Sequence, residues 1–276
     1  MGQTSFIPHR LHGLLLGALL CLAPAAFAVE VRFPERNATR TLQMTTPTGE
    51  PLGEGTLTAW NEGEQLHVVL TYRYDDGRLI EESSLFRQQP ELIQERWTWR
   101  ERRGDTTTRQ YAIDFTTGQA TGVNRTGGKA RRYNEKLKVE PGRTFAGVGF
   151  VLAAKNLMPE LREGQVVKLQ ALAFTPKPRQ VTVSLSRKGS EQLTVNGQAL
   201  SAQRIVIHPE IGLASLVVKA PDTLLSFSTA DTPMLVAGQG SLLEPGDPVV
   251  RTQVVPRKQA PAAARRAPKG SRPGER

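Results

Sequence analysis

The side chains that most often carry chemistry are sparse in this sequence. Beyond residue 28 the chain has two histidines, His67 and His208, which lie far apart and have few potential ligands beside them. A metal site in a protein needs several clustered ligands, and His208 with the nearby Glu210 is too small a set. The sequence therefore predicts no metal site and favours hydrogen-bonding or surface roles for both histidines.

Glutamates are the next candidates, because a pair of carboxylates about 5 to 9 Å apart can hydrolyse a glycosidic bond. Glu81 and Glu82 are neighbours in a predicted strand, so alternation sends them to opposite faces of the sheet. Glu95 and Glu101 lie in an arginine-rich stretch. We expect these glutamates to form cross-strand ion pairs rather than a catalytic pair, with partners among Arg96, Arg100 and Arg109.

Motifs for nucleophilic or phosphate chemistry do not occur either. There is no Gly-x-Ser-x-Gly sequence, and Ser190 and Ser241 lack the strand–turn–helix context that such a nucleophile requires. The glycine-rich residues 122–128 and 147–149 do not have phosphate-loop spacing. We expect a protein without catalysis or cofactor, and an unrecognised hydrolase-type site is the remaining enzymatic alternative.

Aromatic and aliphatic residues make a better case for binding. Trp97 and Trp99 are two residues apart in a predicted strand and therefore point the same way. Sheet core is the more common role for such a pair, but tryptophans that line a cavity would contact an apolar or sugar-like ligand. The residues predicted to bind a ligand are Leu70, Tyr72, Trp97, Trp99 and Phe150.

Strands must position these side chains. Residues 66–74 alternate apolar and polar types, which is the pattern of a half-buried strand, and Asp76-Gly77 then predicts a tight hairpin into residues 79–86. Residues 93–102 are expected to place Ile93, Glu95 and both tryptophans on one face. Similar strands continue through residue 242.

One segment breaks this period. Residues 146–158 have apolar side chains at helical spacing, and the helix is expected to stop before Pro159. With ten to twelve expected strands, the fold class is mainly β: a large curved antiparallel sheet or incomplete β-barrel, with one short helix on its concave side.

The N-terminus is typical of export. Residues 1–28 have Arg10, an apolar run and the small-x-small sequence Ala26-Phe27-Ala28, which together predict a signal peptide. The single cysteine, Cys21, lies in this segment, so the exported chain would have no disulfide or thiolate. The apolar run is too short to span a bilayer. We expect no transmembrane segment in the mature chain, and a periplasmic or secreted location.

Positive charge gathers at the C-terminus. The formal net charge is +10, and residues 246–276 contain eight basic and two acidic residues. Proline, alanine and glycine dominate this segment, so we expect a disordered tail after a single domain over residues 29–245. The tail predicts contact with an anionic envelope surface, whereas export and the absence of aromatics in the tail argue against nucleic acid. The predicted contacts are Arg257, Lys258, Arg265, Arg266, Lys269 and Arg272.

The layout resembles a known group of proteins. Its landmarks are Gly55-Thr56-Leu57, Tyr72-Arg73-Tyr74, a mid-chain helix, the hairpin at residues 193–197 and a last strand at residues 235–240. They resemble an uncharacterised family of exported bacterial β-rich proteins, a domain of unknown function, which is similar to lipoprotein-carrier and lipocalin-like half-barrels. The resemblance covers residues 53–243 and implies a fold, without assigning site residues.

Two hypotheses of function follow, and the hydrolase-type alternative ranks below both. In the first, the concave face of the sheet holds a lipid, a lipoprotein segment or another apolar envelope ligand, which predicts a cavity of a few hundred Å³. In the second, the protein is a structural or interaction protein with a filled core, and its tail docks on anionic surfaces. A salt-sensitive association that depends on residues 246–276 would favour the second.

Overall fold

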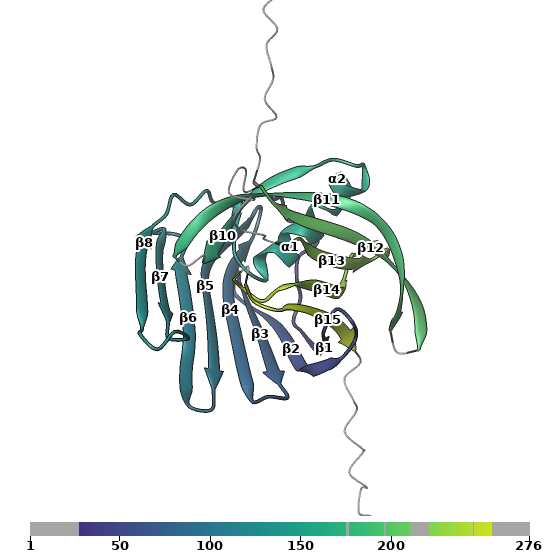
Figure 1. Ribbon diagram of the computed structural model, residues 1–276. Helices are drawn as coiled ribbons and strands as arrows, with labels where there is room; N and C mark the ends of the chain where they lie inside the picture. The colour runs from purple at the N-terminus through teal and green to yellow at the C-terminus, as the bar shows by residue number, and fades with distance from the viewer. Residues whose placement is uncertain (1–27, 175–176, 196, 211–220, 245, 256–276) are drawn as a thin grey trace, which may run out of the picture.

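The computed structural model describes residues 28–174, 177–195, 197–210, 221–244 and 246–255. Within them the chain forms one sheet of fifteen strands in the order β8-β7-β6-β5-β4-β3-β2-β1-β15-β14-β13-β12-β11-β10-β9. The first eight strands form a meander that we call the N-terminal arm, and the last seven form the C-terminal arm (Figure 1). The N-terminal arm comprises β1 (Ala38–Thr45), β2 (Pro51–Glu62), β3 (Gln65–Tyr74), β4 (Arg78–Gln88), β5 (Leu92–Arg103), β6 (Thr106–Asp114), β7 (Gln119–Asn124) and β8 (Arg131–Lys136).

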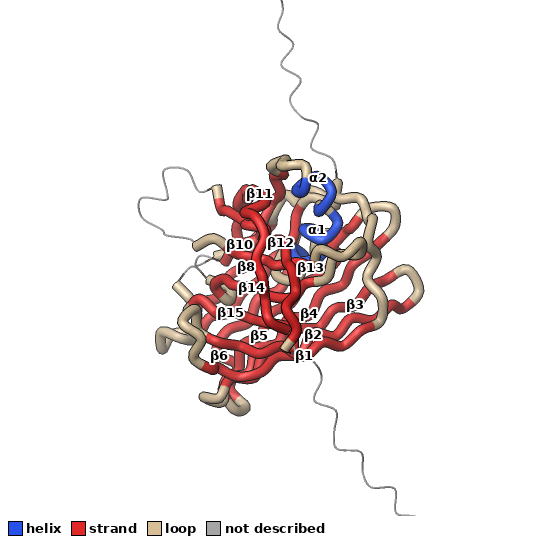
Figure 2. Tube along the Cα trace, turned by 90° about the vertical axis from the view of Figure 1, so that its right-hand side faces the viewer, coloured by secondary structure: helices blue, strands red, loops and turns tan. Residues whose placement is uncertain are grey.

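The two arms join in the middle of the sheet through β1 and β15, where Gln43 is opposite Gln253. Neighbouring strands are antiparallel except β9 and β10, which run parallel. The sheet curves without closing into a barrel (Figure 2), so the predicted curved antiparallel sheet or incomplete barrel is confirmed. The C-terminal arm comprises β9 (Thr144–Phe145), β10 (Val167–Phe174), β11 (Pro178–Val195), β12 (Gln198–Pro209), β13 (Thr223–Ser228), β14 (Leu235–Ser241) and β15 (Val249–Val255).

Two short helices, α1 (Gly149–Asn156) and α2 (Met158–Arg162), replace the single helix that the sequence predicts. The break falls at Leu157, and Pro159 lies in the first turn of α2 rather than beyond the last helical residue. Proline is tolerated there because the N–H groups of a first turn have no helical partner. Both helices lie between the arms, on the concave side of the sheet (Figure 1).

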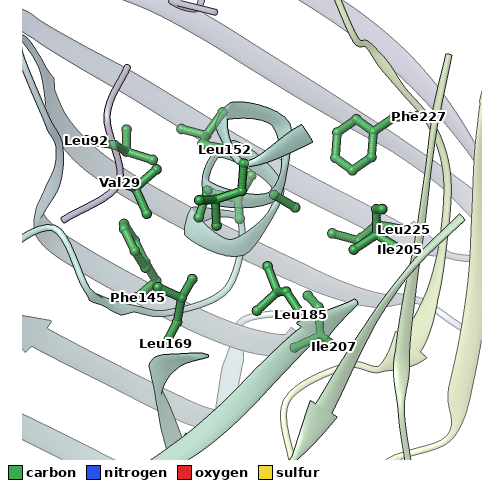
Figure 3. Close-up of a cluster of buried hydrophobic side chains, with 14 of the residues drawn as sticks. Val29, Leu92, Phe145, Leu152, Leu169, Leu185, Ile205, Ile207, Leu225 and Phe227 are labelled. Carbon is green, nitrogen blue, oxygen red and sulfur yellow. The ribbon is translucent and has the colours of Figure 1, made fainter. Parts of the chain in front are cut away.

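The core packs around these helices. Leu152 of α1 lies between residues of both arms in the largest buried cluster (Figure 3). A second cluster contains Trp97 and Trp99 on β5 with Phe174 at the end of β10. Burial of this kind is the main force that holds a cysteine-free domain together. The labelled members of the first cluster are Val29, Leu92, Phe145, Leu152, Leu169, Leu185, Ile205, Ile207, Leu225 and Phe227.

A β-bulge corrects the predicted face of Ile93 and Glu95. Leu85 is opposite Arg96, but the next residue, Phe86, is opposite Gln94, so β5 has an extra residue at this point. The insertion shifts the phase of alternation. Leu92 and Gln94 are therefore buried with the tryptophans, whereas Ile93 and Glu95 lie on the other face and remain partly exposed.

The predicted boundary between the domain and its tail, at residue 246, is wrong. Val249–Val255 form β15, which pairs with β1 on one side and with β14 on the other and is therefore internal to the sheet. The predicted signal peptide lies outside the described residues, except for Ala28. The six predicted anionic-surface contacts, all within residues 257–272, lie outside them as well. Among the described residues, no helix is long and apolar enough to cross a membrane.

Candidate ligand-binding cavity

A cavity of about 470 Å³ lies between the two arms. Strands β1 to β5 form one wall, strands β10 to β15 form the other, and the first turn of α1 closes part of the space with Val148, Phe150 and Val151. Most lining side chains are aliphatic or aromatic. On the N-terminal arm these are Leu42, Leu57, Leu70, Tyr72 and Trp99, and on the C-terminal arm they include Ala171, Val181, Val183, Ile207, Leu225 and Leu242.

Strand register explains why the N-terminal wall is continuous. Leu57 is opposite Leu70, Leu70 is opposite Glu82, and Glu82 is opposite Trp99. Directly paired residues point to the same face of a sheet, so these four side chains form one row across β2 to β5. The row is apolar except for Glu82.

Glu82 is buried, with 7% of its surface exposed. Its Oε1 atom accepts two hydrogen bonds, one from the Val148 N–H at 2.6 Å and one from Trp97 Nε1 at 2.9 Å. Burial raises the pKa of Glu82 to about 7, against the opposing effect of these two hydrogen bonds. A carboxyl group that changes charge near neutral pH therefore lies on the wall of an apolar cavity.

The segment that enters α1 needs glycine beside this carboxylate. Gly147 has φ +50°, and a Cβ atom at this position would lie 1.9 Å from Glu82 Oε1 and 2.6 Å from Trp97 Nε1. Buried Gln94 adds a second anchor: its Oε1 accepts from the Ala146 N–H at 2.8 Å, and its Nε2 donates to the Ala146 carbonyl at 3.2 Å. Polar side chains of β4 and β5 thus fix the start of the helix over the cavity.

Tyr72 is a further polar residue near Glu82. Its ring lies against Gly55, where a Cβ atom would be 2.7 Å from Tyr72 Cδ1, so the glycine makes room for the ring. Burial raises the pKa of the Tyr72 hydroxyl, and the nearby Glu82 charge raises it further. The hydroxyl is therefore neutral at physiological pH and keeps a proton to donate.

Ion pairs hold the chain segment at one edge of the cavity. Leu242 and Leu243, after β14, line the cavity. Arg109 on β6 holds this connection: its Nη1 lies 2.8 Å from Asp247 Oδ1, and its Nη2 lies 2.6 Å from Glu101 Oε2. The pairing of Glu101 with Arg109 that the sequence predicts is confirmed. Tyr111 also donates to Glu244 at 2.6 Å, so β6 contacts both acidic residues of the connection.

Four of the five residues predicted to bind a ligand line the cavity: Leu70, Tyr72, Trp99 and Phe150. Trp97 does not line it. Its ring stacks on Phe174 with centroids 5.3 Å apart, and its indole N–H is used by Glu82. Ligand binding by the other four stays a prediction.

Sequence reasoning missed Glu82 as a cavity residue, although the signal was present. Alternation separates it from Glu81, and the structure does place Glu82 inward while Glu81 faces outward toward Arg102. Glu82 falls in phase with Ile80, Ser84 and Phe86, all of them buried. The alternation therefore indicated that this carboxylate faces inward together with its neighbours in phase.

Of the remaining candidates, neither His67 nor His208 lines the cavity, whereas Ser241 does. His67 on β3 stacks on Trp60 with centroids 4.9 Å apart, and His208 on β12 lies 2.7 Å from Asp222 Oδ1. Ser241 lines the cavity, and its Oγ atom has no hydrogen-bond partner in the described part of the chain. The same part of the chain contains no group of three or more acidic, histidine or cysteine side chains placed to hold a metal ion.

Solved structures similar to this chain include two bacterial proteins. A β-barrel-like protein of domain of unknown function DUF1849 from Brucella abortus matches 80% of this chain and 97% of its own, with 7% sequence identity and a TM-score of 0.42. The hypothetical lipoprotein YmcC from Escherichia coli (K12) matches 78% of this chain and 82% of its own, with 10% identity and a TM-score of 0.33.

Both neighbours are bacterial proteins whose names assign no activity. No family model and no curated protein sequence matches this chain.

Proposed function

We propose that this chain is an exported, non-enzymatic binding protein of the cell envelope that holds an apolar or lipid-like ligand between the arms of its half-barrel. The observation that carries the proposal is the cavity of about 470 Å³. Small-molecule sites typically occupy roughly 300 to 1,000 Å³ and are lined mainly by apolar side chains with a few polar groups. The cavity has this size and this composition.

The position of the cavity supports the proposal. Residues from both arms and from the first turn of α1 line it, and the anchors at Glu82 and Gln94 hold that turn in place. A rigid, preformed site loses little conformational freedom when a ligand enters. Export rests on the features of residues 1–28, and the absence of catalysis rests on the lack of nucleophile and phosphate-loop motifs in the sequence.

Extraction of the purified exported protein with organic solvent, followed by mass spectrometry, tests the proposal. We expect an apolar molecule in amounts close to one per chain. Ala171 on β10 lines the cavity and is partly buried, so Ala171→Phe fills the space without removing a polar group. The matched variant Ala112→Phe changes a partly buried residue on the outer face of β6. Loss of the extracted molecule in Ala171→Phe alone is the expected result, and equal amounts in all three proteins would contradict the proposal.

A further inference from the structure

We infer that the ligand carries a hydrogen-bond-donating head group, an amine in preference to a hydroxyl, which binds the Oε2 atom of Glu82. The inference rests on the proposed function, because it assigns a chemical class to the ligand of the same cavity. It follows from the two oxygens of one carboxylate, which have different surroundings.

Oε1 has a structural role that accounts for all of its contacts. It accepts from Val148 and from Trp97, and thereby anchors the start of α1 to β4 and β5. A glutamine at position 82 would accept the same two hydrogen bonds through its amide oxygen, without a buried charge. The structural role alone therefore does not explain why the residue is a glutamate.

Oε2, the second carboxylate oxygen of Glu82, takes no part in anchoring the helix. None of the described residues donates a hydrogen bond to Oε2. Some buried side-chain atoms lack both a hydrogen-bond partner and contact with solvent, but Oε2 is not one of them, so it retains some exposure. The residue as a whole is more than nine-tenths buried and lines the cavity. The free oxygen is thus reachable from the cavity and retains its capacity to accept hydrogen bonds.

In the part of the chain that the structure describes, no cation forms an ion pair or a hydrogen bond with Glu82. The groups that act on its ionisation are Val148 and Trp97, both neutral, and its cross-strand partners are Leu70 and Trp99. Arg179 on the opposite wall also lines the cavity and has an interaction of its own, and it is not among the groups that shift the pKa of Glu82. The buried cation Arg109 on β6 is paired with Glu101 and Asp247.

An unpaired buried charge is costly, and a charge-assisted hydrogen bond from a bound molecule relieves that cost. A protonated amine supplies both the opposite charge and the donor, whereas a hydroxyl supplies only the donor. A carboxylate head group would instead be repelled by ionised Glu82. Most of the other lining side chains are apolar and suit an alkyl chain.

The test compares three probes with the same alkyl chain, dodecylamine, dodecanol and dodecanoate, titrated below their aggregation concentrations at mildly alkaline pH. The proteins are wild type, Glu82→Gln and the control Glu81→Gln, which makes the same change on the outer face of the same strand. Glu82→Gln retains the acceptor for Val148 and Trp97 and places an amide N–H where Oε2 was. Binding is measured by displacement of a fluorescent apolar dye.

We expect wild type to bind dodecylamine most tightly and Glu82→Gln to lose about tenfold or more of that affinity. Dodecanoate should bind Glu82→Gln at least as well as wild type, which also shows that the variant is folded. Equal affinity of wild type and Glu82→Gln for dodecylamine, or tighter binding of dodecanoate than of dodecylamine to wild type, would overturn the inference alone. Binding of no probe to wild type, or no effect of Ala171→Phe on any probe, would overturn the proposed function as well.

Discussion

Arg109 Nη1 lies 2.8 Å from Asp247 Oδ1, and this contact joins the N-terminal arm to the connection between β14 and β15. The guanidinium also contacts Glu101 and lies over the Trp99 ring, 5.1 Å from its centroid. Its side chain is 8% exposed. One buried cation therefore links the N-terminal arm to the connection whose leucines line the cavity.

Replacement of Arg109 by methionine should lower the free energy of unfolding by about 3 to 5 kcal/mol, because it leaves Glu101 and Asp247 in a largely buried site without a compensating cation. The control is Arg102→Met, which removes a more exposed ion pair with Glu81 at 3.3 Å and should cost less than about 1 kcal/mol. Urea unfolding measures both values. Similar losses in the two variants would show that the Arg109 cluster does not hold the arms together.

Gly147→Ala should destabilise the protein strongly. The new Cβ atom would meet Glu82 Oε1 at 1.9 Å, in addition to the strain of a left-handed conformation at φ +50°. Gly164→Ala is the control, since it has φ +85° but open space around the Cβ position, and it should cost about 1 to 2 kcal/mol. The Gly147→Ala loss should exceed that of the control by at least about 2 kcal/mol in thermal or urea unfolding. Equal losses would mean that Glu82 moves aside freely.

Stability should fall as the pH rises through the range in which Glu82 ionises. The pKa of Glu82 is about 7 in the folded protein against an ordinary value of 4.5, so between these two pH values the folded state binds a proton that the unfolded state lacks. The free energy of unfolding is therefore higher at acid pH. Ionisation of Glu82 should lower it by about 3 kcal/mol by about pH 8.

Glu82→Gln removes this contribution. Its free energy of unfolding should change less than that of wild type between about pH 5 and about pH 8, and it should exceed the wild-type value at the higher pH. Urea unfolding of both proteins at the two pH values provides the measurement, and Glu81→Gln controls for the loss of a surface charge. Parallel pH profiles for wild type and Glu82→Gln would disprove the burial of an ionisable carboxyl here.

Truncation should separate the sheet from the basic residues that follow it. A chain that ends at Val255 retains β15 and should keep the wild-type melting temperature, whereas a chain that ends before Gly246 loses a strand between β1 and β14 and should not fold. If the basic segment binds anionic surfaces, the chain ending at Val255 should no longer sediment with phosphatidylglycerol vesicles at low salt. Retained vesicle binding by this shorter chain would place the contact elsewhere.

Local patterns in the sequence predict much of the secondary structure. Alternation over residues 66–74 predicts a strand, and β3 occupies Gln65–Tyr74. The turn at Asp76-Gly77 follows it, with Gly77 at φ +83°. Both features depend on side chains and dihedral angles within a few residues, which is the range over which sequence patterns are informative.

Features that depend on pairing between residues far apart in the sequence could not be predicted from local patterns. The extra residue at Glu95 is defined only by the pairing of β5 with β4. The sequence did not predict β15, because its residues lie next to a basic, proline-rich segment. The pairing of Gln43 with Gln253 joins the two ends of the domain. The cavity depends on that pairing, so the sequence indicated several of its lining residues but not the polar position of Glu82 among them.

The most direct test of the binding account is fluorescence quenching by an alkyl chain that carries bromine atoms, which quench tryptophan on contact. Trp99 lines the cavity, whereas Trp60 is 37% exposed and stacks on His67. We expect saturable quenching in wild type and in Trp60→Phe, with most of it lost in Trp99→Phe and in Ala171→Phe. Quenching that survives in Trp99→Phe but disappears in Trp60→Phe, or no saturable quenching at all, would contradict the account.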